Sequence, residues 1–138
     1  MARQKVVVVR EFGRPVDAVF GDLADHNKLQ KVFGIPCKRV RDGYGDVNGV
    51  GSVRRLGLKP LAVEETVVAV DPNVSIDYEI TKGGGPIQNH HGRLDFSSTA
   101  RGSRVQWTIE FESPLPAVGP VVKFVLGQAL GIGLKRLG

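Results

Sequence analysis

The sequence predicts an α+β fold in which one curved antiparallel sheet wraps around a long C-terminal helix. Two observations predict it: six strand patterns follow one another at short spacing, and the chain ends in an apolar stretch with helical periodicity over residues 115–137. Strands grouped apart from helices and joined by short turns favour an antiparallel meander. The 138 residues contain no linker or repeat, so we expect one domain over residues 1–138.

The C-terminal stretch is expected to be the helix that the sheet covers. Pro116 and Pro120 suit a first helical turn, where a missing N–H costs little. The apolar positions that share one helical face are Val122, Leu126, Ala129, Leu130, Gly133, Leu134 and Leu137. Glycines inside this helix indicate close backbone approach or space left for a cavity. Lys123 and Gln128 interrupt the apolar run, so no stable membrane insertion is expected.

The other elements follow from local patterns. A β-branched run predicts a first strand over residues 4–12, and Pro15 then opens the first of two short helices, 15–25 and 26–33. Turns rich in Gly, Pro, Asn and Asp separate the remaining strands. These strands are predicted over residues 38–41, 52–58, 61–70, 75–82, 87–97 and 104–112.

Composition narrows the class of partner. The formal charge is +5, but the basic residues are scattered and no nucleic-acid motif surrounds them, so no nucleic-acid partner is expected. The single cysteine, Cys37, excludes an intrachain disulfide and is expected to be a core residue. Four valines near the N-terminus are too few for a signal peptide, which indicates a cytoplasmic protein.

Three adjacent polar pairs lie on predicted strands and point to a site inside the sheet. Because neighbouring residues on a strand point to opposite faces, one member of each pair must face the concave side. The pairs are Arg54-Arg55, Glu64-Glu65 and His90-His91.

The turns predict which members face inward. Across the turn over residues 99–102, Leu94 lies opposite Trp107, and alternation then places His90 inward and His91 outward. The three-glycine loop, 83–85, is predicted to set Tyr78 opposite His90.

The pairing of the strands over residues 52–58, 61–70 and 75–82 depends on shorter turns. Val67 is expected opposite Tyr78, and Arg54 opposite Glu65. A slip of one residue would replace the inward Arg54 and Glu65 by Arg55 and Glu64, so both assignments remain open.

Nearly the whole chain resembles a known superfamily. The stretches that carry the resemblance are PVDAVFGDLADHNKL, GVGSVRRLG, EETVVAVDPN, NHHGRLDFSSTARGSRVQWTIEF and the closing helix. In this order they look like the START-related helix-grip superfamily (SRPBCC), and most of all its bacterial polyketide cyclase/dehydrase-like branch. The resemblance implies an apolar cavity between the sheet and the long helix that holds lipids, polyketides, hormones or quinones. It implies no shared catalytic residue.

The leading functional hypothesis is binding or carriage of a small, mostly apolar molecule. The predicted ligand contacts are Arg54, Glu65, Val67, Tyr78, His90, Leu94, Trp107, Leu126 and Leu130. An alternative is a polyketide aromatase/cyclase or dehydratase in which His90 shuttles a proton and Tyr78 orients it. A second alternative is a protein-interaction module of the co-chaperone or ribosome-associated kind. No metal or cofactor is predicted, because His90 and His91 diverge, and the oligomeric state stays open.

Overall fold

The computed structural model describes residues 3–58 and 62–138, and within them the predicted order of elements is confirmed. The strands are β1 (Arg3–Phe12), β2 (Cys37–Arg41), β3 (Val53–Leu56), β4 (Val63–Asp71), β5 (Ser75–Lys82), β6 (Gln88–Thr99) and β7 (Gly102–Glu112). The helices are α1 (Val16–Ala24), the short 3-10 helix η1 (His26–Lys28), α2 (Leu29–Phe33) and α3 (Val118–Arg136). Residue 61, where the fourth strand was predicted to begin, lies outside the described residues.

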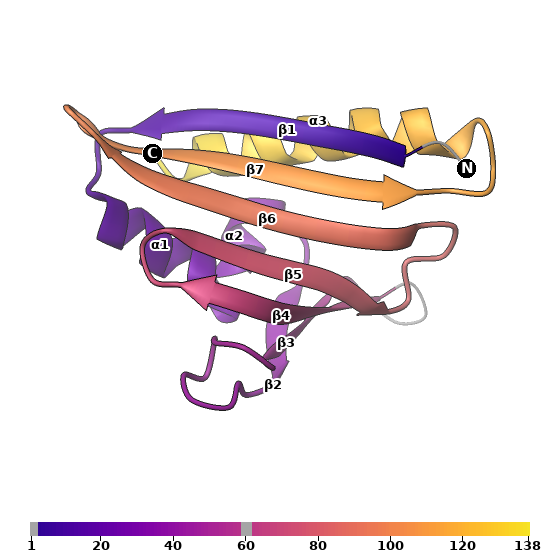
Figure 1. Cartoon of the computed structure of the whole chain (residues 1–138), viewed down its shortest axis with the longest axis horizontal. Helices are drawn as coiled ribbons and strands as arrows, with labels where there is room; N and C mark the ends of the chain where they lie inside the picture. Colours follow the sequence, from indigo (N-terminus) through magenta and orange to yellow (C-terminus); the bar gives the residue numbers. More distant parts are fainter. Residues whose placement is uncertain (1–2, 59–61) are drawn as a thin grey trace.

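The strands form one antiparallel sheet in the order β1-β7-β6-β5-β4-β3-β2 (Figure 1). The chain therefore makes a meander from β2 to β7 and then places β7 beside the N-terminal strand. Figure 1 shows α3 running along β1 and β7, at the edge of the sheet away from β2. The fold class predicted from the sequence, a helix-grip arrangement, is confirmed.

Local chemistry explains the helices that precede the sheet. Pro15 takes the cap position of α1, and Asp17 lies in the first turn, where the positive end of the helix dipole favours a carboxylate. The Asp25 carboxylate accepts a hydrogen bond from the Asn27 backbone N–H at 3.0 Å and so starts η1. Gly34 ends α2 in the left-handed conformation, with φ of 71°.

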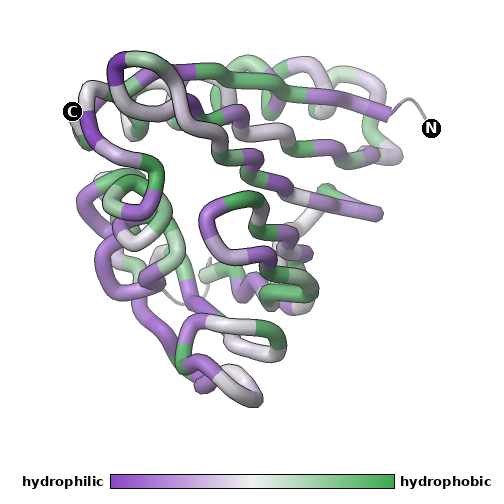
Figure 2. Tube along the Cα trace, turned by 60° about the vertical axis from the view of Figure 1, so that its left-hand side comes forward, coloured by the Kyte–Doolittle hydropathy of each residue, from purple (hydrophilic) through white to green (hydrophobic). Residues whose placement is uncertain are grey.

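The inward faces of the strands meet in one hydrophobic core. Figure 2 shows hydrophobic and hydrophilic residues alternating along the strands, as expected for a sheet with one buried face. The largest fully buried side chains include Trp107, Tyr78, Phe111 and Leu130. Burying a large apolar side chain contributes about 1.5–3 kcal/mol, so this cluster stabilises the fold.

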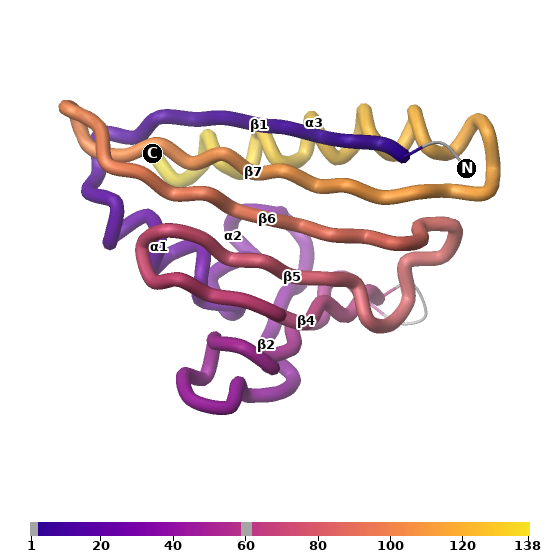
Figure 3. Tube along the Cα trace, in the orientation of Figure 1, coloured from indigo at the N-terminus to yellow at the C-terminus, as the bar shows by residue number. Residues whose placement is uncertain are grey.

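The C-terminal part of α3 is packed most deeply into this core. Leu130 and Leu134 are fully buried, whereas Val122 and Leu126 are half-buried and Ala129 is exposed. Gly133 allows α2 to approach closely, because a Cβ there would lie 2.7 Å from the Val32 carbonyl oxygen. Figure 3 shows the trace of α3 following β1, and its N-terminal half is the less covered part.

Candidate functional site

The centre of the candidate site is a buried ion pair on β3 and β4. The register places Arg54 opposite Glu65, and Arg54 Nε donates to Glu65 Oε1 at 2.7 Å. Their side chains are only 3% and 12% exposed. The neighbouring pair, Arg55 and Glu64, lies on the opposite face of the same strands with 27% and 19% exposure. Of the two assignments that the sequence left open, the one with Arg54 and Glu65 inside is therefore right.

The Arg54 guanidinium keeps its charge and retains donors for a further acceptor. Burial lowers the pKa of Arg54, but Glu65, Tyr78 and Cys37 together outweigh burial and the net shift is upward. The Arg54 carbon Cζ lies 4.4 Å from the centroid of the Tyr78 ring, a cation–π contact. Arg54 Nη2 is buried and has no hydrogen-bond partner among the described residues. Such a donor costs about 1–3 kcal/mol until an acceptor reaches it.

The Tyr78 ring that contacts the guanidinium is held in place by Trp107. Trp107 Nε1 donates to the Tyr78 hydroxyl oxygen at 2.8 Å, and both side chains are 1% exposed. Burial raises the pKa of Tyr78, and the Glu65 carboxylate adds to the effect, so the hydroxyl stays protonated and able to donate. Phe33 from α2 covers Trp107 edge-on, with ring centroids 5.6 Å apart.

The predicted pairing of Tyr78 with His90 is wrong. Tyr78 lies opposite Gly92, and a Cβ at Gly92 would lie only 2.1 Å from Tyr78 Cζ. The aromatic ring therefore crosses the strand through the space that the glycine leaves. The pairs from Ser75↔Asp95 to Tyr78↔Gly92 centre the connection between β5 and β6 on Gly85 rather than on Gly84, which shifts the register by two residues relative to the prediction.

His90 stays beside the cluster because an even shift preserves which face a residue occupies. Its Nδ1 accepts a hydrogen bond from the Ile80 backbone N–H at 3.1 Å, and its ring centroid lies 5.6 Å from that of Tyr78. Burial lowers the pKa of His90, with Glu65 partly opposing, so the ring is neutral at pH 7. Since Nδ1 accepts, the proton is on Nε2, and the ring offers a donor to a ligand.

The other predicted contacts are core residues around this cluster. Val67 lies opposite Tyr78 and Leu94 lies opposite Trp107, and both are 2% exposed. Leu130 is buried on α3, and Leu126 is half-buried one turn earlier. The structure thus gathers Arg54, Glu65, Tyr78, His90 and Trp107, which we call the polar cluster, and surrounds them with apolar side chains.

A hollow of about 390 Å³ lies at the end of the sheet, and no residue of the polar cluster is among those that line it. Ile80 connects the two, because it lines the hollow, lies opposite Glu65 and donates to His90. The hollow is lined by Ala62, Val63, Ile80, Gly83, Gly84, Gly85 and Ile87. None of the five hollows described for residues 3–58 and 62–138 is lined by a residue of α3, so the cavity expected between the sheet and this helix is not among them.

Sequence reasoning missed a second buried group next to Arg54. His26 Nε2 lies 2.8 Å from Ser52 Oγ, and the Cys37 thiol donates to the His26 carbonyl oxygen at 3.3 Å. Burial lowers the pKa of His26 to about 3, helped by Arg54 and Arg39, and raises the pKa of Cys37 to about 11. A neutral histidine and a protonated thiol with no solvent access are structural, and nothing near His26 in the sequence marks it as buried.

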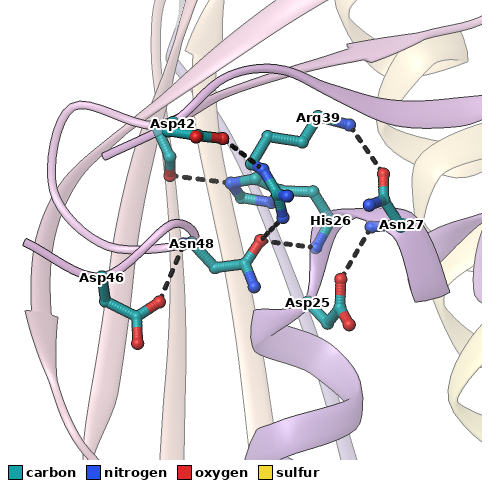
Figure 4. A network of polar contacts seen from close by, with 8 residues as sticks. Asp25, His26, Asn27, Arg39, Asp42, Asp46 and Asn48 are labelled. Atoms are coloured by element: carbon teal, nitrogen blue, oxygen red, sulfur yellow. Dashed lines mark hydrogen bonds and ion pairs between the residues drawn. The ribbon is translucent and has the colours of Figure 1, made fainter. Parts of the chain in front are cut away.

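The same histidine anchors the loop between β2 and β3 (Figure 4). Asn48 Oδ1 accepts from the His26 backbone N–H at 3.2 Å and from Arg39 Nη1 at 3.0 Å. Arg39 also binds Asp42, and its backbone N–H donates to Asn27 Oδ1 at 3.0 Å. This network holds the glycine-rich loop against η1 and so fixes one end of β3, the strand that carries Arg54.

Comparison with known proteins places this geometry in a family. A family profile described as "Polyketide cyclase / dehydrase and lipid transport" matches residues 3–138. The chain belongs to this family. A search of curated proteins found no match.

Solved structures support the same fold at low sequence identity. A protein from Thermobifida fusca has a TM-score of 0.79 and 21% identity, covering 96% of this chain and 89% of that one. A START superfamily protein from Mycobacterium smegmatis has a TM-score of 0.78 and 16% identity, with 96% and 93% coverage. Ginseng major latex-like protein 151 from Panax ginseng has a TM-score of 0.75 and 14% identity, with 98% and 95% coverage. These similarities establish the helix-grip fold.

Proposed function

We propose that the protein binds and carries a small, mostly apolar molecule whose polar end is an acceptor oxygen held by Arg54. The observation that carries this proposal is the buried Arg54 Nη2, a charged donor without a partner among the described residues. Ligand sites are mostly apolar with a few convergent polar groups, and the polar cluster has this composition. The family description, which includes lipid transport, agrees with such a role.

The chemistry of the cluster favours a carboxylate, carbonyl or phenolate oxygen. Arg54 supplies a charged donor, His90 Nε2 a neutral one, and the Tyr78 hydroxyl a third. Glu65 offsets part of the positive charge, so the site tolerates a neutral carbonyl as well as an anion. The apolar remainder of the ligand would lie toward Ile80 and Ile87, where the hollow opens.

The catalytic alternative, ring closure or loss of water from a polyketide, is less well supported. A proton shuttle needs a nitrogen that accepts and releases a proton, but His90 Nδ1 is already occupied by the Ile80 N–H. The raised pKa of Tyr78 keeps its hydroxyl protonated, so it serves as a donor rather than a base. Turnover of a poly-β-keto substrate analogue that depends on His90 would favour the enzyme over the carrier.

The test compares two matched double variants on the same strands. Arg54→Leu/Glu65→Leu removes the inward pair together, which avoids leaving one buried charge alone. Arg55→Leu/Glu64→Leu removes the outward pair at the same positions along the strands. Equilibrium binding of dodecanoate and of dodecanol is measured for each protein, and native mass spectrometry of the wild type reports any co-purified molecule.

The proposal predicts that wild type binds dodecanoate more tightly than dodecanol. The inward variant should lose this preference, a change of about tenfold or more for one charged hydrogen bond of 1.5–3 kcal/mol. The outward variant should behave as wild type. Equal binding of both probes by all three proteins, or no binding by wild type, would reject Arg54 as the polar anchor.

A further inference from the structure

The outward face of α3 is an apolar surface that no described part of the chain covers. Four large side chains stand out: Val121, Phe124, Val125 and Ile132 are 61%, 68%, 57% and 53% exposed. At 3.6 residues per turn their spacing places them on one side of the helix, opposite the buried Leu130. We call these four residues the α3 stripe.

The stripe belongs to a segment whose charges are all of one sign. From Ser113 to Gly138 there is no acidic residue, and the charged side chains are Lys123, Lys135 and Arg136. All three are exposed. At 3.6 residues per turn Lys135 and Arg136 lie on the side of the stripe, whereas Lys123 lies on the opposite side. An exposed apolar stripe flanked by basic residues is the arrangement of helices that lie in the interface of an anionic membrane.

Charge also argues against the simplest other occupant, a second copy of the chain. Two α3 helices packed stripe to stripe would bring together only basic side chains, on a protein whose formal net charge is already +5. Like charges facing each other across an interface oppose association. An anionic lipid surface instead gains from the two basic residues on the side of the stripe, Lys135 and Arg136.

We propose that the α3 stripe docks the protein on anionic lipid surfaces, with the helix axis along the membrane plane. By length and composition α3 also qualifies as a membrane-spanning helix, but Leu130 and Leu134 are fixed in the core, so the folded protein offers one face only. The docked face lies on the same helix whose inner side borders the core. This proposal stands on the stripe and its charges and does not depend on what the polar cluster binds.

The test is flotation with two kinds of vesicle, phosphatidylcholine alone and phosphatidylcholine mixed with phosphatidylglycerol. Wild type should float only with the mixed vesicles, and less as salt rises. Phe124→Ser/Val125→Ser should reduce the partition coefficient onto the mixed vesicles about tenfold, since burying these side chains contributes more than 1.4 kcal/mol. The matched control is Val7→Ser/Val9→Ser, which removes apolar residues of 48% and 44% exposure from β1.

The outcomes separate the alternatives. Equal loss of flotation in the stripe and control variants, flotation with phosphatidylcholine alone, or no flotation of wild type overturns the proposal. Sedimentation equilibrium of the same proteins measures their oligomeric state. If wild type is a dimer and Phe124→Ser/Val125→Ser is a monomer, the stripe binds a second copy of the chain instead of a membrane. Emission from the buried Trp107 confirms that each variant is folded.

Discussion

Replacing Gly92 by Ala tests the packing that shapes the polar cluster. An added Cβ would lie 2.1 Å from Tyr78 Cζ and 2.5 Å from both Cε atoms. Ordinary carbon contacts are about 3.5–4.0 Å, so the ring must move by roughly 1.4 Å or more. That displacement breaks the 2.8 Å hydrogen bond from Trp107 Nε1 and leaves a buried N–H without its acceptor.

The expected cost combines two effects. Overpacking costs about 1–3 kcal/mol, and the unsatisfied N–H costs another 1–3 kcal/mol or so. Gly92→Ala should therefore destabilise the protein by roughly 2–6 kcal/mol, or lower the melting temperature by roughly 6 °C or more. The assay is urea unfolding followed by the emission of Trp107, the one tryptophan in the chain, which also reports directly on the disturbed contact.

Two comparisons make this prediction specific. Gly131→Ala, in a helix position where a Cβ meets nothing within 4 Å, should be neutral or stabilising. A Tyr78→Leu variant lacks the Cε and Cζ atoms that the added Cβ would meet. In that background Gly92→Ala should therefore cost much less stability than in wild type. A loss below about 1 kcal/mol in wild type, or the same loss in both backgrounds, would refute the close contact between Gly92 and the ring.

Three further predictions concern the core. Leu130→Ala should destabilise by about 2–5 kcal/mol in urea unfolding, because Leu130 is 1% exposed; a loss under about 1 kcal/mol would mean that it borders open space. Tyr78→Phe should cost about 1–3 kcal/mol by removing the acceptor of Trp107 Nε1, and unchanged stability would contradict that hydrogen bond. The pKa of His26 is lowered to about 3 when folded, so the neutral form is favoured and stability present above pH 6.5 is lost as pH falls toward 3. This loss of stability should reach about 1.4 kcal/mol per pH unit. A His26→Gln variant lacks this titration, so the free energy of unfolding of wild type should fall more steeply than that of the variant between pH 6.5 and 3.

The sequence was sufficient for the fold because its signals were local and repeated. Strand alternation and tight turns predicted that Leu94 lies opposite Trp107 and Val67 opposite Tyr78, and both pairings are confirmed. The choice of Arg54 over Arg55 depended on a single turn register, which a slip of one residue would have inverted.

The candidate site was predicted only in part, because it depends on features without a local signal. The connection between β5 and β6 is centred one residue later than its three glycines suggest, which places Gly92 where His90 was predicted, and alternation alone does not reveal where a loop is centred. The buried His26 escaped notice because its burial comes from contacts with Ser52 and Cys37, which are distant in sequence.

Nuclear magnetic resonance of the arginine and tryptophan side chains tests the central claim most directly. Arg54 Nε–H and Trp107 Nε1–H give signals from the middle of the polar cluster, and the latter is the one indole signal of the chain. Titration with dodecanoate should shift both signals in parallel with the backbone amides of Ile80 and Ile87 at the hollow. Shifts confined to other surfaces, with the Arg54 and Trp107 signals unchanged at saturation, would contradict the account.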